Sequence, residues 1–297
     1  MHVVVLKASI VGAGFIWLSK SYRDCARGPG RCNRTGFTQS VIHAVCKEVA
    51  MATEAVLMAG QKSNLIRREE VAEGTMAFHF EKPPGFTFKA GQSADVTLID
   101  PPDTDAEGNT RTFSIASPPF ENELVFTTRM RDTAFKRSLK KVPLATGVKI
   151  DSAAGSFTLH KNPAKSAVFL AGGIGITPFL SIVQQANYDR LPHKLYLFYS
   201  NRRPEDAAFL DTLQTLQTKN PNFHLICTMT EMSKSNKEWK GETLLMDKEM
   251  LSRHLAVRQG PIYYIAGPPT MVAAMRQTLI GAGVEVDDIR AEEFAGY

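Results

Sequence analysis

The chain has 297 residues, of which 43% are hydrophobic and 22% are charged, a composition typical of a soluble globular protein with room for two domains. Its net charge of +5 arises in residues 1–50, where seven Lys and Arg stand against two Asp and Glu, so the remaining chain is electroneutral. This distribution argues against a nucleic-acid-binding protein. The cysteine spacing matches no zinc or iron–sulfur pattern, so no metal site is predicted.

Residues 1–60 are predicted to be an extension ahead of the folded part of the chain. Three interpretations stay open: a disordered or non-native segment before a candidate second start at Met51, a membrane anchor formed by residues 3–18, or an organelle-targeting segment. The apolar run of residues 3–18 is short for a membrane span. We therefore expect a cytoplasmic protein, with membrane contact only if that run acts as an anchor.

Residues 61–162 consist of short alternating runs separated by turn residues, a pattern that predicts an antiparallel β-barrel, expected to be of the Greek-key type. One short helix is expected from Thr133 to about Lys141. The predicted strands are Thr75–Glu81, Ser93–Ile99, Thr110–Ala116, Leu124–Thr128, Val148–Asp151 and Ser156–His160.

Residues 163–297 change to an alternation of apolar strands and helix-like segments, which predicts a parallel sheet covered by helices. The domain boundary is expected near residues 161–165. The predicted strands are Ala167–Ala171, Leu195–Tyr199, Phe223–Met229 and Ile262–Ala266, and the predicted helices are Pro178–Ala186, Glu205–Thr218 and Thr270–Ala282.

A glycine-rich loop, Gly172-Gly173-Ile174-Gly175-Ile176-Thr177-Pro178, joins the first of these strands to a helix. Pro178 suits a first helical turn, and the N–H groups and dipole of a helix start favour a phosphate. A tight strand–helix turn that merely requires glycine explains the loop equally well. A later strand is followed by the same arrangement, Ala266-Gly267-Pro268-Pro269-Thr270-Met271.

The loop after the second strand of this sheet is basic. Ser200, Arg202 and Arg203 offer a hydroxyl and two guanidinium groups, which a nucleotide 2′-phosphate would need, and they motivate a hypothesis of NADPH preference. The alternative is a solvated basic loop in which Glu205 and Asp206 cap the next helix.

The barrel half contains Arg111-Thr112-Phe113-Ser114-Ile115-Ala116-Ser117. On a strand, Arg111 and Phe113 share one face, and Ser114 points the other way. An arginine for a diphosphate, an aromatic ring for a flat ring system and a hydroxyl for a ring nitrogen would suit a flavin. An ordinary half-buried strand explains the same residues.

Four segments in this order resemble the ferredoxin–NADP reductase superfamily: RTFSIAS at 111–117, GGIGITP at 172–178, AGPPTM at 266–271 and the ending EEFAGY at 292–297. The resemblance covers about residue 62 to the end and implies an FAD-binding barrel followed by an NAD(P)-binding α/β domain. Phe113 replaces the usual tyrosine of the flavin motif, and Ala266 stands where many members carry cysteine. The cofactor implied is FAD, and the substrate is NADPH or NADH.

The resemblance also implies roles for individual residues. Arg111 would bind the FAD diphosphate, Phe113 would stack on the isoalloxazine, and Ser114 would hydrogen-bond flavin N5. Phe294 would cover the other flavin face, with Tyr297 as a rival for that role, and Glu292 would be the acidic residue near the flavin edge. The implied catalytic residues are Ser114, Glu292 and Phe294. The implied cofactor-binding residues are Arg111, Phe113, Ser114, Ser117, Thr133, Gly172, Gly173, Gly175, Thr177, Ser200, Arg202, Arg203, Gly267, Pro268 and Tyr297.

The function implied is electron transfer from NAD(P)H through FAD to a separate one-electron acceptor such as a ferredoxin, a flavodoxin or an oxygenase component. A monomer is expected. One alternative is a free-flavin or ferric-chelate reductase, and another is a non-catalytic electron-conduit or nucleotide-sensing subunit. Basic residues at 129–141 offer either an acceptor-docking rim or a solvated helix face.

Overall fold

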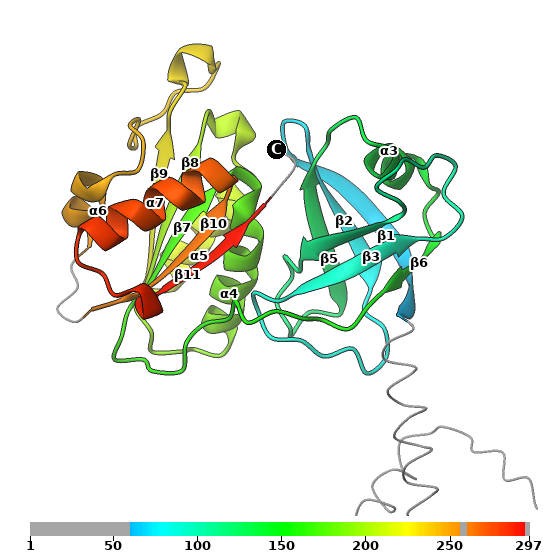
Figure 1. The fold of residues 1–297 in the computed structure, drawn as a ribbon, viewed down its shortest axis with the longest axis horizontal. Coiled ribbons are helices and arrows are strands. Elements are labelled where there is room, and N and C mark those ends of the chain that lie inside the picture. The colour runs from blue at the N-terminus through cyan, green and yellow to red at the C-terminus, as the bar shows by residue number, and fades with distance from the viewer. Residues whose placement is uncertain (1–59, 256–259, 295–297) are drawn as a thin grey trace, which may run out of the picture. The chain divides into compact units, whose positions relative to one another are not determined.

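A computed structural model describes residues 60–255 and 260–294, all of which belong to one compact unit (Figure 1). The predictions for residues 1–59 and for Tyr297 lie outside the described residues. Within the described ranges, no helix combines the length and the apolar character that a membrane crossing needs.

The first half forms a six-stranded antiparallel sheet in the order β4-β3-β6-β1-β2-β5. A bridge between Ile115 and Phe126, with a 2.8 Å hydrogen bond from Ala116 N to Val125 O, joins the end of β4 to β5. The two ends of the strand order therefore meet, which confirms the predicted antiparallel fold. The strands are β1 (Gln61–Ala72), β2 (Thr75–Glu81), β3 (Ser93–Leu98), β4 (Thr110–Ser114), β5 (Glu123–Arg129) and β6 (Gly147–Ile150).

The interior of this sheet is filled by the apolar side of each strand, because successive strand residues point to opposite faces. Phe78, Phe80 and Phe126 are all buried there. Helix α3 (Ala134–Lys141) adds Phe135 to the same cluster. The helix predicted from Thr133 to about Lys141 is confirmed, and Thr133 caps it, since its hydroxyl accepts a 3.3 Å hydrogen bond from Lys136 N.

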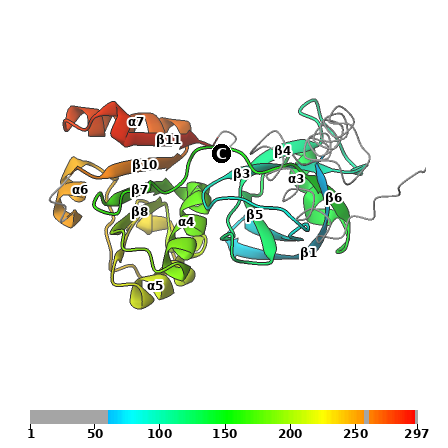
Figure 2. The ribbon, with the colours of Figure 1, turned by 90° about the horizontal axis from the view of Figure 1, so that it is seen from below.

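The second half is a five-stranded parallel sheet in the order β11-β10-β7-β8-β9, which confirms the predicted α/β architecture. Helices α4 and α5 cover one face, and α6 and α7 cover the other (Figure 2). The strands are β7 (Ala167–Gly172), β8 (Leu195–Asn201), β9 (Phe223–Met229), β10 (Ile262–Gly267) and β11 (Ile289–Glu293). The helices are α4 (Ile176–Tyr188), α5 (Leu210–Lys219), α6 (Lys248–His254) and α7 (Pro269–Gly281), with 3₁₀ turns η1 (Gly173–Gly175), η2 (Pro204–Asp206), η3 (Met232–Lys234) and η4 (Val286–Asp288).

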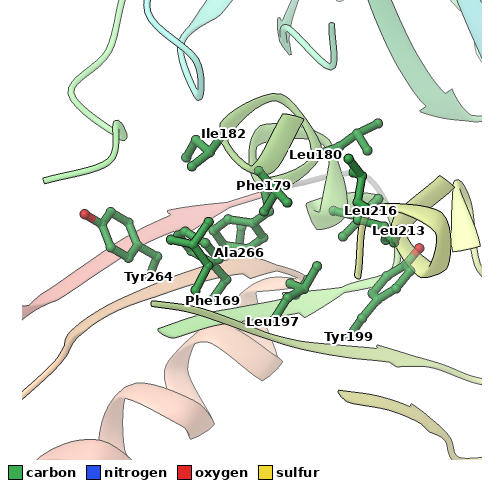
Figure 3. Close-up of a cluster of buried hydrophobic side chains, with 14 of the residues drawn as sticks. Phe169, Phe179, Leu180, Ile182, Leu197, Tyr199, Leu213, Leu216, Tyr264 and Ala266 are labelled. Carbon is green, nitrogen blue, oxygen red and sulfur yellow. The ribbon is translucent and has the colours of Figure 1, made fainter. Parts of the chain in front are cut away.

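Both faces of the parallel sheet are apolar, as expected for strands covered on two sides. On the α4/α5 face, Phe169, Leu197 and Tyr264 pack against Phe179 of α4 and Leu213 of α5 (Figure 3). The alternate residues of the same strands pack against α6 and α7. The sheet is therefore held rigidly behind its carboxyl edge, where the glycine-rich loops begin.

Two predicted elements are wrong. Residues 156–160 form no strand; Phe157 instead packs on Phe179 at 5.6 Å between ring centroids, and His160 N donates to Tyr264 Oη at 2.9 Å. The alternating pattern of residues 156–160 therefore reflects side-chain contacts with the parallel sheet and not pairing with a neighbouring strand. The helix predicted over Glu205–Thr218 is divided into η2 and α5, because Phe209 adopts a left-handed backbone with φ of 60°.

Candidate functional site

The carboxyl edge of the parallel sheet has a switch point between β7 and β10. Strands β8 and β9 lie on one side of β7, and β10 and β11 lie on the other. In open parallel sheets the ligand crevice forms at such a point. Gly172 ends β7 and Gly267 ends the neighbouring β10, so both predicted glycine loops start here.

The two loops pack directly against each other. A Cβ on Gly175 would overlap the carbonyl oxygen of Ala266, and one on Gly172 would overlap the sulfur of Met271. A Cβ on Gly267 would lie 3.1 Å from Gly172 N. Contacts within the protein therefore account for these three glycines, as the tight-turn alternative proposed, and a direct role toward a phosphate stays a prediction.

The remaining residues of this edge are tied to the same loops. Gly173 has φ of 53°, which a residue with a side chain rarely adopts. Thr177 is buried, and its hydroxyl donates to Ile174 O at 3.1 Å. Phe294 N donates to Gly267 O at 3.0 Å, so the C-terminal segment passes beside the loop that contains Pro268.

The basic loop after β8 contains two neighbouring arginines, Arg202 and Arg203, which make different contacts. Arg203 makes two hydrogen bonds to Asp206, from Nε at 3.0 Å and from Nη2 at 2.9 Å, and a third to Glu73 at 3.0 Å. The hydrogen bonds of Asp206 raise the pKa of Arg203. The Arg202 side chain is 68% exposed, and its Nε lies 3.6 Å from Glu231 Oε1.

The capping roles considered for Glu205 and Asp206 are not seen. Burial would by itself raise the pKa of Asp206, but the hydrogen bonds and charge of Arg203 lower it below its usual value. The Glu205 carboxylate accepts hydrogen bonds from Ser235 Oγ and Asn236 N. Ser200, at the end of β8, is half-buried.

In the first sheet, Arg111 and the start of α3 converge on one anion. The Asp105 carboxylate accepts a 3.1 Å hydrogen bond from Ala134 N, and its other oxygen lies 3.5 Å from Arg111 Nη2. The predicted diphosphate ligands, Arg111 and the helix that begins after Thr133, are therefore brought together. A guanidinium and a helix N–H that already share a carboxylate form a donor set that fits a diphosphate.

Phe135 packs against both Arg111 and Phe113, and sequence reasoning missed it. Its ring lies under the Arg111 guanidinium at 5.2 Å and 5.9 Å from the Phe113 ring. Arg111 and Phe113 thus share one face of β4, as predicted. Ser114 is buried on the other face, and its hydroxyl makes no hydrogen bond to any described residue.

Ser117, the last residue of RTFSIAS, links the antiparallel half of the chain to the parallel half. Its hydroxyl accepts a hydrogen bond from Val125 N at 3.0 Å, and its carbonyl accepts one from Ser181 Oγ of α4 at 2.7 Å. Both serines are buried. The strand that carries RTFSIAS is thereby joined to the helix that follows GGIGITP.

Glu292 of β11 lines a cavity of about 400 Å³ together with Ser156, Phe157, Arg290 and Ala291. Burial raises the pKa of Glu292 to about 7. The neighbouring Arg290 does not lower the pKa of Glu292 again, because its guanidinium donates to Thr158 O at 2.8 Å and lies over the Tyr264 ring. A carboxyl group with a pKa near neutrality can hold or release a proton under ordinary conditions.

Comparison with known proteins agrees with this arrangement. Residues 169–277 match the family model of the oxidoreductase NAD-binding domain. The F component of the Na⁺-translocating NADH-quinone reductase of Methylococcus capsulatus is 29% identical over 136 residues, which cover 44% of this chain and 33% of that protein. The reductase component of propane 2-monooxygenase of Mycolicibacterium smegmatis is 26% identical over 229 residues, covering 72% of this chain and 61% of the relative.

Among solved structures, a ferredoxin–NADP⁺ reductase of Neisseria gonorrhoeae with bound FAD and NADP superposes with a TM-score of 0.65 at 22% identity. The superposition covers 78% of this chain and 98% of that one, and it shows a shared fold. The chain spans between about a third and three fifths of the length of the two curated relatives described above.

Proposed function

We propose that this chain is an FAD- and NAD(P)-binding oxidoreductase of the ferredoxin–NADP reductase-like superfamily and that it transfers electrons from NAD(P)H through FAD to a separate protein acceptor. The observation that carries the proposal is the convergence of Arg111 and the first N–H of α3 on one anion. This donor set lies in the antiparallel half, and the NAD-binding family match lies in the other half. Such a pairing suits a flavin held beside a nicotinamide.

Bound FAD would supply the chemistry that the side chains lack, acceptance of a hydride and release of single electrons. Arg111 and the α3 N-terminus would hold its diphosphate, and Phe113 would lie against its ring system. Ser114 would offer its hydroxyl to flavin N5, and Glu292 would hold or release a proton at its carboxyl group. The protein's contribution is alignment and exclusion of water.

The nucleotide would lie along the carboxyl edge between β7 and β10. The loops that contain Gly173, Thr177 and Gly267 would take its diphosphate and nicotinamide ends. Ser200 and Arg202 would read the 2′-phosphate of NADPH, whereas Arg203 is held in its ion pairs with Asp206 and Glu73. The NADPH preference is therefore proposed to rest on Arg202.

The acceptor is proposed to be a protein, in keeping with the reductase component among the relatives. Of the basic side chains near α3, Arg137 pairs with Asp103 and Arg129 approaches Asp206. Among these basic side chains near α3, three are exposed and make no ion pair with any described residue: Arg131, Lys140 and Lys141. These three are the candidates for contact with an acidic acceptor.

Steady-state assays test this function. The FAD-loaded full chain should oxidise NADPH in the presence of ferricyanide, an artificial one-electron acceptor, and an Arg111→Ala variant should lose FAD binding. Absence of turnover despite bound FAD would contradict the proposal and would favour a non-catalytic role in a larger assembly.

One observation favours a second candidate, a free-flavin reductase. The charge of Arg111 is already offset by Glu107, at 2.7 Å, and by Asp105. A flavin that enters against these carboxylates would be held less tightly. Loss of flavin on dialysis, with saturation kinetics in added flavin, would support this second function over the first.

A further inference from the structure

The loop between β3 and β4 supplies its own anion to the predicted diphosphate ligands. Asp105 Oδ2 accepts from Ala134 N at 3.1 Å, and Asp105 Oδ1 lies 3.5 Å from Arg111 Nη2. Oδ1 also accepts from Glu107 N at 3.0 Å, which fixes the carboxylate in this position. A single carboxylate thus occupies both partners that a diphosphate would use.

The two terminal nitrogens of the Arg111 guanidinium make further contacts with the same loop and with the first residue of β4. Nη2 donates to Glu107 Oε2 at 2.7 Å, and Nη1 lies within hydrogen-bond distance of the carbonyl oxygens of Glu107, Gly108 and Thr110, at 2.7 to 3.1 Å. Asp105 and Glu107 together carry two negative charges, the same charge as a flavin diphosphate. Arg111 cannot keep these contacts and also bind a diphosphate through the same N–H groups.

Neighbouring positive charges favour an anion at the position that the Asp105 carboxylate occupies. Burial and then the charges of Arg131 and Arg111 lower the pKa of Lys136, whose ammonium lies in the same region and donates to Arg129 O at 2.8 Å. Three cations therefore favour an anion here. If the loop carboxylates leave, the two phosphates of a diphosphate can take their place beside these cations.

The loop can move without uncovering the core. Residues 104–108 are exposed, with side-chain exposures of 33% for Asp105 and 70% for Glu107. The buried apolar cluster of this sheet contains no residue of that segment. Displacing the loop therefore breaks polar contacts, and those contacts can be remade with a diphosphate.

We propose that Asp105 and Glu107 are an internal competitor for the FAD diphosphate and so determine how strongly the chain prefers FAD to flavins that lack a diphosphate. This inference rests on the proposed function. It makes the two carboxylates specificity-determining residues: FAD must displace them, whereas riboflavin, which has no phosphate, leaves them in place.

The test compares FAD and riboflavin binding to the flavin-free full chain by flavin fluorescence titration. Asp105→Asn keeps an oxygen acceptor for Ala134 N but removes the charge, and it should tighten FAD binding by roughly tenfold while riboflavin binding stays within about twofold. Glu107→Gln, at a more exposed position, should shift the FAD-to-riboflavin ratio in the same direction. Asp103→Asn is the matched control, because Asp103 pairs with Arg137 and not with Arg111.

The outcomes separate the inference from the function on which it rests. If wild-type protein binds FAD but neither variant changes the FAD-to-riboflavin ratio, the inference is wrong and the function stands. The same holds if Asp103→Asn shifts the ratio as much as Asp105→Asn does. If neither the wild type nor any variant binds FAD, the proposed function and the inference both fail.

Discussion

Arg202 and Arg203 are neighbours in the chain, but different contacts hold them. Arg203 is engaged by Asp206 and Glu73, whereas Arg202 is largely exposed. We expect Arg202→Ala to raise the KM for NADPH roughly tenfold and to leave the KM for NADH unchanged, because the 2′-phosphate loses a charged donor. Steady-state kinetics with both nucleotides measure this. An equal rise for NADH would show that Arg202 does not read the 2′-phosphate.

Arg203→Ala should act on stability instead. It leaves Asp206, whose side chain is 4% exposed, without its hydrogen-bonding partner and with only the 3.6 Å approach of Arg129, and a buried carboxylate that has lost its hydrogen bonds destabilises the fold. We expect a lower Tm for this variant and an unchanged Tm for Arg202→Ala. An unchanged Tm in Arg203→Ala would contradict the structural role.

Glu292 should make stability depend on pH. Because burial raises its folded-state pKa from 4.5 to about 7, the stability that protonated Glu292 contributes is fully present below about pH 4.5 and is lost as the pH rises through about 7. Relative to Glu292→Gln, the wild-type Tm should therefore fall between about pH 5 and about pH 8. Glu293→Gln, at an exposed neighbouring position, is the control and should stay parallel to wild type. Parallel Tm curves for wild type and Glu292→Gln would refute the raised pKa.

At the scale of elements, the two glycine loops should behave as one packed unit. An Ala at 175 would drive its methyl group into the backbone of Ala266, which cannot move aside without shifting β10. Gly175→Ala should destabilise the protein without any nucleotide present, by about 1–3 kcal/mol or more. Urea unfolding measures this free energy.

The matched control is Gly281→Ala in α7, where a Cβ meets nothing within 4 Å. This change should be neutral or slightly stabilising, since Ala is the better helix former. If both variants unfold like wild type, the packing account of the glycine loops is wrong.

Strongly patterned elements could be predicted from sequence, and polar ones could not. The apolar runs over 167–171 and 223–229 are strands as predicted. Strand β11 (Ile289–Glu293) was missed because it is a polar edge strand that pairs with β10 alone. Strand β1 was missed because its sequence, QKSNLIRREEVA, is mostly charged and polar, although it pairs with strands on both sides.

The relative placement of Arg111 and Phe113 could be predicted from the sequence, whereas the ion pairs of the candidate site could not. The strand pattern of residues 111–117 predicted that Arg111 and Phe113 lie on one face, and the structure confirms this, since both side chains contact the Phe135 ring. No spacing rule could show that Asp105 pairs with Arg111, because that pairing depends on how the β3–β4 loop folds back on β4. Asp206 follows Arg203 by three residues, and the two side chains meet because η2 turns the chain there. Phe135 was within reach of sequence reasoning, since it is the second residue of a helix expected after Thr133.

At the scale of the whole molecule, the two halves of the proposed reaction are connected by a short buried link. Ser181 Oγ of α4 donates to Ser117 O at the end of the flavin motif, at 2.7 Å. The helix that follows the nucleotide loop is thereby fixed to the strand that carries the flavin residues. This connection fits a protein whose two cofactor sites must act on each other.

The most direct test of the central claim is an absorption spectrum of the purified full chain, reconstituted with FAD and titrated anaerobically with NADPH. We expect flavin bands in the visible blue, retained by the protein on gel filtration, which bleach as NADPH is added and return when a one-electron acceptor follows. A protein that retains no flavin, or a bound flavin that NADPH does not bleach, would contradict the account.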